Sequence, residues 1–216
     1  MSKAVIRDIC EEDIPALKAL MVEAWGEGWN FNRFDPNADL FCALQDVYLS
    51  VFLNSATCGK IALQDGKVVG AVLCAANGED IKFRAWQKDV TANTLTLLSA
   101  AENERKDIVE HISTAFGAIG QLLHNKTDAY GGSLEFLVVT PQARGLKIGK
   151  QLWDEACGYF RTKNKNSIYL ITDTACNVGF YDYNGFLRVD SITATYNFST
   201  GQKEFDIFLY EYNFDN

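Results

Sequence analysis

The chain contains 216 residues, of which 48% are apolar and 22% are charged. This composition is typical of a soluble globular protein, and at roughly 100–200 residues per domain it predicts one domain over residues 1–216. Acidic residues outnumber basic ones by 28 to 20, and the net charge of −8 argues against nucleic acid and anionic membranes as partners. No stretch approaches the roughly 18 uninterrupted apolar residues of a membrane span, and no apolar signal core opens the chain. We therefore expect a cytoplasmic protein.

The cysteines and histidines argue against a metal site. None of the six cysteines forms a C-x-x-C pair, so we expect reduced and mostly buried thiols. The two histidines, His111 and His124, lie in one helical pattern, about three and a half turns apart. Zinc needs a closed set of nitrogen and sulfur ligands, and these residues do not supply one. We expect no metal cofactor.

The first half of the chain predicts a strand, two helices and a hairpin. Residues 5–9 are expected to form the strand, and apolar residues at helical spacing predict a helix over 14–25, after three acidic residues that suit a helix start. Residues 39–53 predict a second helix. An Asp-Gly pair between two apolar runs predicts a hairpin over 60–75. The loop of residues 25–29 is flanked by two tryptophans, which fit either core packing or a substrate-gripping loop.

The second half alternates helices and strands before a closing hairpin. Its predicted elements are a helix at 102–126, a strand at 134–140, a helix at 149–162, a strand at 167–172, a short helix at 177–183 and paired strands at 191–198 and 205–212. The first of these strands is apolar apart from Glu135, so both its faces should be covered. Aromatic residues alternate along the closing hairpin and fit either a core or a homodimer surface. Together the elements predict a mixed α/β domain with a helical insertion around residues 79–130.

The segment with the clearest chemistry joins a strand to a helix. Residues 137–152 read LVVTPQARGLKIGKQL, which predicts a buried strand, a loop and the start of a helix. A helix N-terminus binds anions through its unpaired amides and its partial positive charge. Two glycines permit close approach of a ligand, and Arg144, Lys147 and Lys150 reverse the acidic balance locally. The segment predicts a diphosphate site, and it lacks the glycine patterns of ATP-binding P-loops and dinucleotide folds.

Two motifs resemble those of a known family. Residues 139–152 fit V-x-P-x-x-R-G-x-x-I-G-x-x-L, which resembles motif A of the GNAT acyl-CoA N-acyltransferases. Residues 176–186, CNVGFYDYNGF, resemble motif B with its F-Y-x-x-x-G-F core. The resemblance implies a mixed, mostly antiparallel central sheet flanked by helices, with two parallel strands splayed at the coenzyme A site. It also implies an N-acetyltransferase that moves an acetyl group from acetyl-CoA to a primary amine by direct transfer in a ternary complex.

The resemblance implies roles for individual residues. Backbone groups of three strand residues would pair with the pantetheine arm of acetyl-CoA: Leu137, Val138 and Val139. Arg144 and the amides of six residues after it would hold the pyrophosphate: Gly145, Leu146, Lys147, Ile148, Gly149 and Lys150. Asn177 and Phe180 are placed near the pantetheine, and the phenol of Tyr181 near the thioester sulfur, where it would protonate the departing thiolate. The N–H of Val139 would face the thioester oxygen.

The sequence departs from the family pattern at two positions. Lys147 stands where motif A normally has a glycine. Its side chain either points away and leaves the backbone amides free to bind the phosphates or adds an ammonium to the phosphates. We favour the second, and a reduced affinity for the cofactor is the further alternative. Thr174 stands where an asparagine is common in motif B. Asn177, one helical turn before Tyr181, is the expected substitute for that asparagine.

The sequence leaves the general base and the acceptor open. Glu135 and Asp173 are the candidate bases, and the alternative for both is a solvated or salt-bridged acid. The acceptor is expected to be a small-molecule or peptide amine. Two other functions are compatible with the pattern: a non-catalytic acyl-CoA-binding module on the same fold, and an unrelated phosphate-binding or interacting α/β domain.

Overall fold

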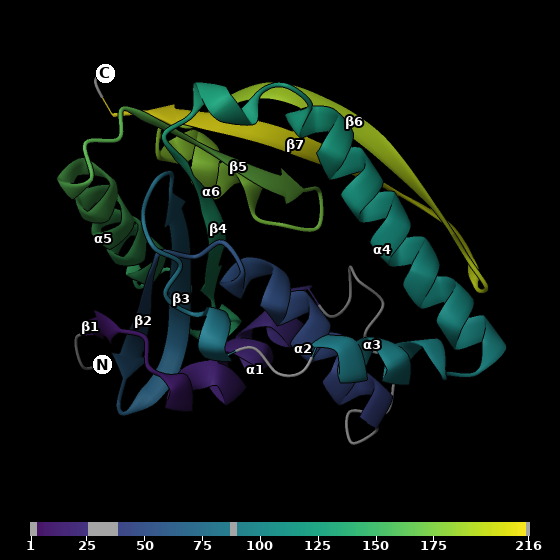
Figure 1. The fold of residues 1–216 in the computed structure, drawn as a ribbon. Coiled ribbons are helices and arrows are strands. Elements are labelled where there is room, and N and C mark those ends of the chain that lie inside the picture. The colour runs from purple at the N-terminus through teal and green to yellow at the C-terminus, as the bar shows by residue number, and fades with distance from the viewer. Residues whose placement is uncertain (1–3, 26–38, 87–89, 215–216) are drawn as a thin grey trace.

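A seven-stranded sheet forms the centre of the molecule, with helices packed on both of its faces (Figure 1). The computed structural model describes residues 4–25, 39–86 and 90–214. The strands are β1 (Val5–Asp8), β2 (Cys58–Gln64), β3 (Lys67–Ala76), β4 (Gly132–Val139), β5 (Ser167–Asp173), β6 (Leu187–Phe198) and β7 (Gly201–Asn213). The helices of the described residues are α1 (Ile14–Trp25), α2 (Asp39–Leu53), α3 (Val90–Leu98), α4 (Glu102–Leu123), α5 (Ile148–Thr162) and α6 (Val178–Tyr183).

The predicted fold class is confirmed. Strands pair in the order β1-β2-β3-β4-β5-β7-β6, and each neighbouring pair is antiparallel except β4 with β5. The predicted elements occur in the expected order, and α2 has the predicted bounds. α3 had no separate counterpart in the sequence pattern. Of the predicted loop between the two tryptophans, residues 26–29 lie outside the described residues, so Trp25 alone is placed.

The long helix α4 ends at Leu123 and not at residue 126 as its pattern predicts. Asn125 adopts a left-handed φ of 57°, a conformation that asparagine tolerates and that commonly ends helices. A 3₁₀ turn at Thr127–Ala129 follows and leads into β4. The helix end is therefore set by one backbone conformation and not by a loss of apolar periodicity.

Strands β4 and β5 diverge at the centre of the sheet. Their parallel ladder contains one register pair, Ser133 with Tyr169, close to the start of both strands. Toward their carboxyl ends the two strands separate (Figure 1). On its other side β4 continues to pair with β3, as far as Val139 opposite Gly70. The predicted splay is thereby confirmed. Within the described part of the chain, the edge of β4 that faces β5 has no strand partner after Ser133.

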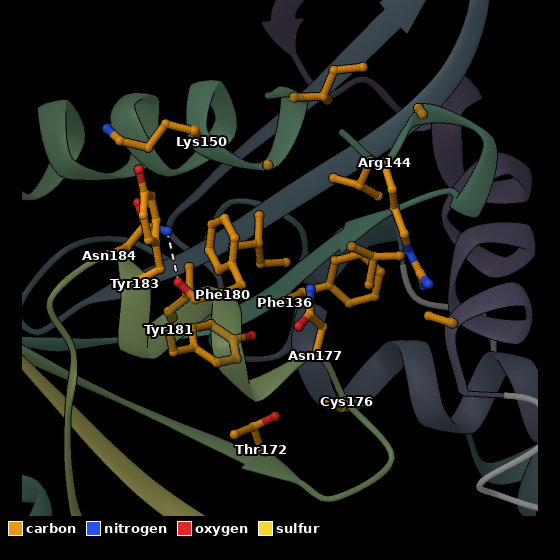
Figure 2. Close-up of a pocket in the computed structure, with 18 of the residues that line it drawn as sticks. Phe136, Arg144, Lys150, Thr172, Cys176, Asn177, Phe180, Tyr181, Tyr183 and Asn184 are labelled. Atoms are coloured by element: carbon orange, nitrogen blue, oxygen red, sulfur yellow. Dashed lines mark hydrogen bonds between the residues drawn. The ribbon is translucent and has the colours of Figure 1, made fainter. Parts of the chain in front are cut away.

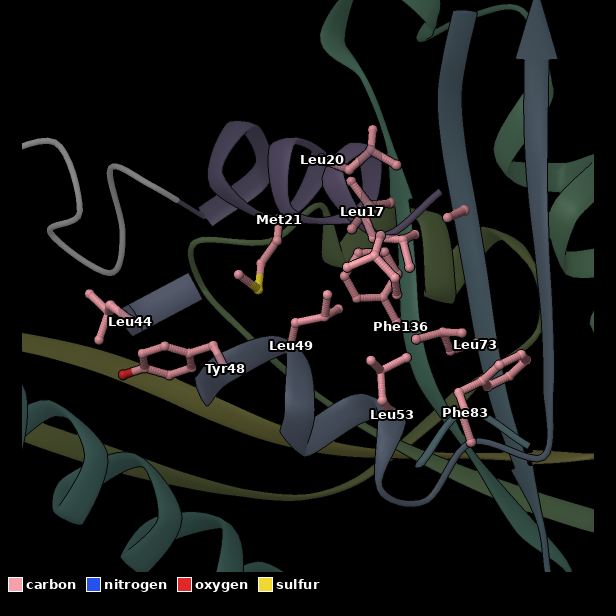
Figure 3. Packing of buried hydrophobic residues seen from close by; sticks show 14 of the residues in the cluster. Leu17, Leu20, Met21, Leu44, Tyr48, Leu49, Leu53, Leu73, Phe83 and Phe136 are labelled. Carbon is pink, nitrogen blue, oxygen red and sulfur yellow. The ribbon is translucent and has the colours of Figure 1, made fainter. Parts of the chain in front are cut away.

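Two hydrophobic clusters hold the helices on opposite faces of the sheet. On one face, α1 and α2 cover Phe136 of β4 (Figure 3). The residues at the centre of this cluster are at most 2% exposed and are Leu17, Met21, Leu49, Leu53 and Phe136. Burial of one such side chain contributes about 1.5–3 kcal/mol, so the end of α1 is firmly placed over β4. The cluster on the other face forms around α5 and is called the α5 cluster. The residues that α5 contributes to it are Ile148, Leu152, Trp153, Ala156, Cys157 and Phe160.

A third cluster joins α4 to the hairpin of β6 and β7. Ala118 and Leu122 of α4 pack there with Tyr196, Phe198 and Ile207 of the hairpin. On the opposite face of the hairpin, two further aromatic side chains, Phe208 and Tyr210, are buried in the α5 cluster. These burials support the core alternative for the hairpin's alternating aromatic residues.

All six cysteines are free thiols. Three of them are buried, namely Cys58, Cys74 and Cys157. Three are partly or fully exposed, namely Cys10, Cys42 and Cys176, so the expectation of mostly buried thiols is wrong for half of them. Within the described residues, no helix combines the length and the apolar character that crossing a membrane requires.

Candidate functional site

A cavity of about 390 Å³ lies where β4 and β5 diverge. Its walls are β4 from Leu134 to Val139, the loop and helix start between Ala143 and Lys150, and the end of β5 together with α6. Ala24 and Trp25, at the end of α1, complete the lining. Figure 2 shows side chains from these elements converging on one space. Segments that resembled two separate motifs thus meet around a single cavity.

The cavity lining includes the predicted site residues with two exceptions, Leu146 and Asp173. Leu146 packs against the α5 cluster. Asp173 accepts a hydrogen bond from the backbone N–H of Ala175 at 2.8 Å, which stabilises the turn after β5. Burial raises the pKa of Asp173, although its hydrogen bonds oppose the rise. The geometry therefore favours a turn-forming role for this carboxylate.

Glu135 is the extra residue of a β-bulge in β4. The β3–β4 register runs from Leu73 opposite Phe136 directly to Cys74 opposite Leu134, which leaves Glu135 without a partner on β3. Glu135 belongs to the cavity lining, and its carboxylate accepts a hydrogen bond from the Ser133 hydroxyl.

Burial raises the pKa of Glu135 above its ordinary value, and hydrogen bonds from the hydroxyls of Ser133 and Ser55 oppose this rise. A carboxylate with a raised pKa is a better proton acceptor than an ordinary one near neutral pH. Among the residues that the structure describes, Glu135 has no salt-bridge partner, and it is only partly exposed. Its environment therefore differs from the alternative that the sequence left open.

Lys147 occupies a backbone conformation that normally belongs to glycine. It is the N-cap of α5, with φ 61° and ψ 16° in the left-handed region. Gly145, two residues earlier, has a φ of 80°. The glycine that motif A prefers at this position is explained by this positive φ, because a Cβ there is strained. Lys147 preserves the shape of the loop at a conformational cost.

The start of α5 presents backbone amides at the cavity. Gln151 donates the first intrahelical hydrogen bond, to the Lys147 carbonyl at 3.0 Å. The amides of Ile148, Gly149 and Lys150 precede it and belong to the helix end, where N–H groups have no helical acceptor. Together with the partial positive charge of the helix end, these amides suit an anionic group.

Gly149 is required by packing between α5 and α6. A Cβ at this position would lie 3.2 Å from Cε2 of Phe180 and 3.6 Å from Cγ2 of Val139. Its absence lets Phe180 approach the start of α5 closely. A Cβ at Gly145, by contrast, would meet nothing within 4 Å. Of the two motif glycines, Gly145 therefore serves the turn and Gly149 serves helix packing.

The three cations of motif A do not form one cluster. Lys150 makes a salt bridge with Asp154, one turn further along α5. Figure 2 shows Arg144 and Lys150 on opposite sides of the cavity. Lys147 also belongs to the lining. The local reversal of charge predicted from the sequence is thus spread around the cavity and partly balanced by Asp154.

Tyr181 of α6 faces the cavity from a mostly aromatic environment. Its ring centroid lies 5.6 Å from that of Phe180, 5.5 Å from that of Phe186 and 5.8 Å from that of Tyr210. Its hydroxyl points toward the side of the cavity where Asn177 and Cys176 lie (Figure 2). Burial raises the pKa of Tyr181 well above its ordinary value, and the nearby Cys176 and Asp173 add to the rise. The phenol therefore keeps its proton throughout the neutral range and can donate it.

Several lining residues were not predicted. They include Phe136, Thr172, Cys176, Tyr183 and Asn184. Trp25, which also lines the cavity, ends α1 and begins the loop that the sequence offered as a substrate-gripping loop. Cys176, Tyr183 and Asn184 lie within motif B, but their types carry no chemistry that marks them in advance.

Metal ligands do not gather in the part of the chain that the structure describes, where no group of three or more His, Cys, Asp and Glu side chains could hold an ion. Among the cavity-lining residues, the ionisable side chains are one carboxylate, Glu135, three cations, two phenols and the thiol of Cys176. Such a set can bind an anionic ligand and transfer protons.

The sequence matches the family model of the acetyltransferase (GNAT) family over residues 14–186. No curated protein matches it. This family match covers most of the chain and includes both motifs.

Solved structures share the fold. An N-acetyltransferase from Staphylococcus aureus Mu50 is 13% identical, with a TM-score of 0.55 over 98% of this chain and 99% of its own. An agmatine N-acetyltransferase variant in its apo form is 14% identical, with a TM-score of 0.57 over 96% and 99% of the two chains. The paia N-acetyltransferase from Thermoplasma acidophilum, in complex with coenzyme A, is 15% identical, with a TM-score of 0.50 over 99% and 100%.

Proposed function

Because this chain belongs to the acetyltransferase (GNAT) family, we propose that it is an N-acetyltransferase that moves an acetyl group from acetyl-CoA to a primary amine by direct transfer in a ternary complex. The observation that carries the proposal is the cavity at the β4–β5 splay, with Tyr181 in its wall and the start of α5 at its edge. Binding both substrates together supplies proximity, which is worth many orders of magnitude in effective concentration.

The residues of the cavity suit acetyl-CoA. The edge of β4 that faces β5 has no strand partner beyond Ser133, so backbone groups of Leu137, Val138 and Val139 are available to a pantetheine arm. Arg144 and the amides that follow it, up to Lys150, suit the pyrophosphate. Asn177 and Phe180 line the same space. Acetyl-CoA would supply the activated acyl group, and the coenzyme A complex of the Thermoplasma protein of like fold supports this assignment.

Tyr181 is proposed as the general acid. Its raised pKa keeps the phenol protonated, so it has a proton to give to a departing thiolate. The backbone N–H of Val139, at the end of β4, is proposed to stabilise negative charge that develops on the acyl oxygen. Both groups come from elements that line the cavity.

Glu135 is proposed as the general base, with Asp173 as the alternative. Glu135 lines the cavity, and burial raises its pKa, so it can take a proton from the attacking amine directly or through a water molecule. Asp173 does not belong to the lining, and its carboxylate is engaged by the Ala175 amide. The geometry therefore favours Glu135.

The whole chain is proposed to be one N-acetyltransferase domain with residues 79–130 as a helical insertion, since β3 and β4 pair directly on either side of that segment. The acceptor is proposed to be a small-molecule or peptide amine, and the agmatine N-acetyltransferase of like fold offers one example of an amine to test. The net charge of −8 argues against nucleic acid as a partner. A cytoplasmic location and a homodimer are further parts of this proposal.

The test is a thiol-release assay with acetyl-CoA across polyamines, amino acids, aminoglycosides and peptide N-termini, with mass spectrometry of the acetylated amine. The proposal predicts amine-dependent release of coenzyme A and a product that gains one acetyl group. Tight binding of acetyl-CoA in calorimetry, together with no transfer to any amine, would instead support a non-catalytic acyl-CoA-binding module. No binding of coenzyme A would contradict both functions.

A further inference from the structure

A buried hydroxyl on β7 connects α6 to the edge strand β6. Tyr210 is fully buried, with 0% of its surface exposed. Its hydroxyl donates a hydrogen bond to Asp182 Oδ1 at 3.0 Å. The same oxygen accepts hydrogen bonds from Arg188 Nε at 3.0 Å and Arg188 Nη2 at 2.7 Å. The donor and acceptor capacity of this hydroxyl is thus used in full, as a buried polar group requires.

The network holds the helix that carries Tyr181. α6 has six residues, and a helix of that length is not stable without tertiary contacts. Asp182 follows Tyr181 directly in α6, so its bond to Tyr210 fixes the helix at the residue next to the proposed acid. The rings of Tyr181 and Tyr210 also pack together, with centroids 5.8 Å apart. Tyr210 therefore constrains both the backbone and the ring of its neighbour.

Arg188 is an exposed residue of β6 whose guanidinium is placed by contacts with β7. It lies directly opposite Tyr210 in the β6–β7 register. Its guanidinium carbon lies 3.9 Å from the ring centroid of Phe208 and 5.2 Å from that of Tyr210, distances at which a cation interacts favourably with an aromatic face. The planar guanidinium then presents two N–H groups to one oxygen.

The network acts on position and not on proton transfer. Its hydrogen bonds join Arg188, Tyr210 and Asp182, and Tyr181 contacts it through its ring. Burial also raises the pKa of Tyr210, so this hydroxyl stays protonated and keeps its bond to the Asp182 carboxylate. What it can transmit to Tyr181 is orientation.

We propose that Tyr210, together with Asp182 and Arg188, is a positioning residue that holds the phenol of Tyr181 at the cavity. The inference rests on the proposed function, because it takes Tyr181 as the general acid. A general acid that is displaced slightly loses much of its effect, since a misplacement of about 1 Å can cost a factor of about 100 in rate.

Tyr210→Phe is the direct test because it keeps the ring beside Tyr181 and removes the hydroxyl. The expected result is a fall in kcat of about tenfold or more, with the KM for acetyl-CoA and the affinity for coenzyme A unchanged. Asp182→Ala should give the same loss, and Asp182→Asn should restore most of the rate because its amide oxygen still accepts the bond. Tyr196→Phe is the matched control, since Tyr196 is buried on the other face of the same hairpin.

A double-mutant cycle separates positioning from general stability. In the Tyr181→Phe background, Tyr210→Phe should lower kcat no further, because the group it positions is absent. Equal losses in both backgrounds would overturn the inference. Loss of coenzyme A affinity in step with kcat would also overturn it, since that result indicates a disturbed fold.

A ¹⁹F NMR measurement, which does not depend on catalytic activity, distinguishes this inference from the proposed function. In protein labelled with 3-fluorotyrosine, the ¹⁹F resonance of Tyr181 is identified by its absence in Tyr181→Phe. Asp182→Ala should shift or broaden that resonance, and Asp182→Asn should leave it in place. An unchanged resonance in Asp182→Ala would overturn the inference even in an active enzyme. A shifted resonance in a protein that transfers no acetyl group would contradict the proposed function alone.

Discussion

The indole nitrogen of Trp25 lies 3.2 Å from the sulfur of Cys176, so the end of α1 contacts the turn that leads into α6. Both residues line the cavity. The Trp25 ring also packs edge-on against Phe136, with ring centroids 5.3 Å apart. One wall of the cavity is therefore built by residues that are far apart in sequence, and it lies on the face of the sheet that α1 covers.

Trp25→Phe tests whether this wall contacts the amine. The phenyl ring keeps much of the apolar packing but removes the N–H that reaches Cys176. We expect the KM for the amine to rise by up to about fivefold, because the hydrogen bond that holds this wall in place, worth roughly 1 kcal/mol, is lost and the wall must be ordered again when the amine binds. The affinity for acetyl-CoA should be unchanged. Steady-state kinetics with calorimetry check this. A weaker affinity for acetyl-CoA with an unchanged KM for the amine would place Trp25 on the cofactor side.

Replacing Lys147 separates its backbone from its side chain. Lys147→Gly should stabilise the fold by about 1 kcal/mol, because glycine adopts the positive φ of this position without strain. Lys147→Ala keeps the strain and removes the ammonium, so it is the matched control. Urea unfolding measures the stability of both variants.

The same two variants test the phosphate contact of Lys147. If the ammonium contacts the phosphates, Lys147→Ala should bind acetyl-CoA about threefold to tenfold more weakly, as expected for the loss of one exposed charge contact worth roughly 1 kcal/mol. Calorimetry at two salt concentrations measures this, since added salt screens such a contact. Tighter binding of acetyl-CoA by both variants would contradict the contact. It would show that Lys147 lowers the affinity of the wild type for acetyl-CoA.

The pH dependence of the rate identifies the base. Burial raises the pKa of Glu135 above the ordinary 4.5, so its basic form is lost at a higher pH than usual as the solution is acidified. The acidic limb of kcat/KM should therefore lie above pH 4.5. Glu135→Gln should lower the rate and abolish that limb, whereas Asp173→Asn should retain it. If neither variant loses the limb, both assignments are wrong.

A partly buried ion pair near the N-terminus, between Arg7 and Asp13, should contribute to stability in a pH-dependent way. Asp13 is 6% exposed and accepts hydrogen bonds from Arg7 at 2.7 and 2.8 Å. These bonds lower the pKa of Asp13 from 3.8 to about 2. Because the folded pKa lies below the unfolded one, the stabilisation is present above pH 3.8 and is lost as the pH falls toward 2. Allowing for solvent around Arg7, we expect it to contribute about 1 kcal/mol.

Asp13→Asn should therefore lower the free energy of unfolding at neutral pH and have little effect near pH 2. Urea denaturation at several pH values measures the difference. Asp8→Asn is the control, because the Asp8 side chain is 83% exposed although it pairs with Lys60, and exposed pairs contribute little. An equal loss of unfolding free energy in both variants at neutral pH would contradict the assignment to the Arg7–Asp13 pair.

Local sequence patterns predicted most of the fold. Apolar spacing placed α1, α2 and α5, and the Asp-Gly turn placed the β2–β3 hairpin. The two motif segments were expected to share one site, and the structure brings them to one cavity. The predicted end of α4 was wrong because the helix end depends on the left-handed φ of Asn125. Asparagine can adopt this conformation but does not always do so, so the sequence alone does not show where the helix ends.

The details of the site depend on contacts that no local pattern encodes. The bulge at Glu135 arises from the pairing of β4 with β3, so the local sequence of β4 does not predict it. The contact of Trp25 with Cys176 joins distant segments. Asp173 ends β5, and its carboxylate accepts a hydrogen bond from the Ala175 amide and does not belong to the cavity lining. Strand register, long-range contacts and side-chain direction are the three features of the site that could be determined only from the structure.

The most direct test of the account is the effect of Tyr181→Phe on acetyl transfer. Thiol release is measured with saturating acetyl-CoA and an amine that the wild type acetylates, and coenzyme A binding is measured by calorimetry on both proteins. We expect a kcat lower by about a hundredfold or more, the range expected for loss of a general acid, with unchanged coenzyme A affinity. A Tyr181→Phe variant that transfers acetyl groups as fast as the wild type would contradict it.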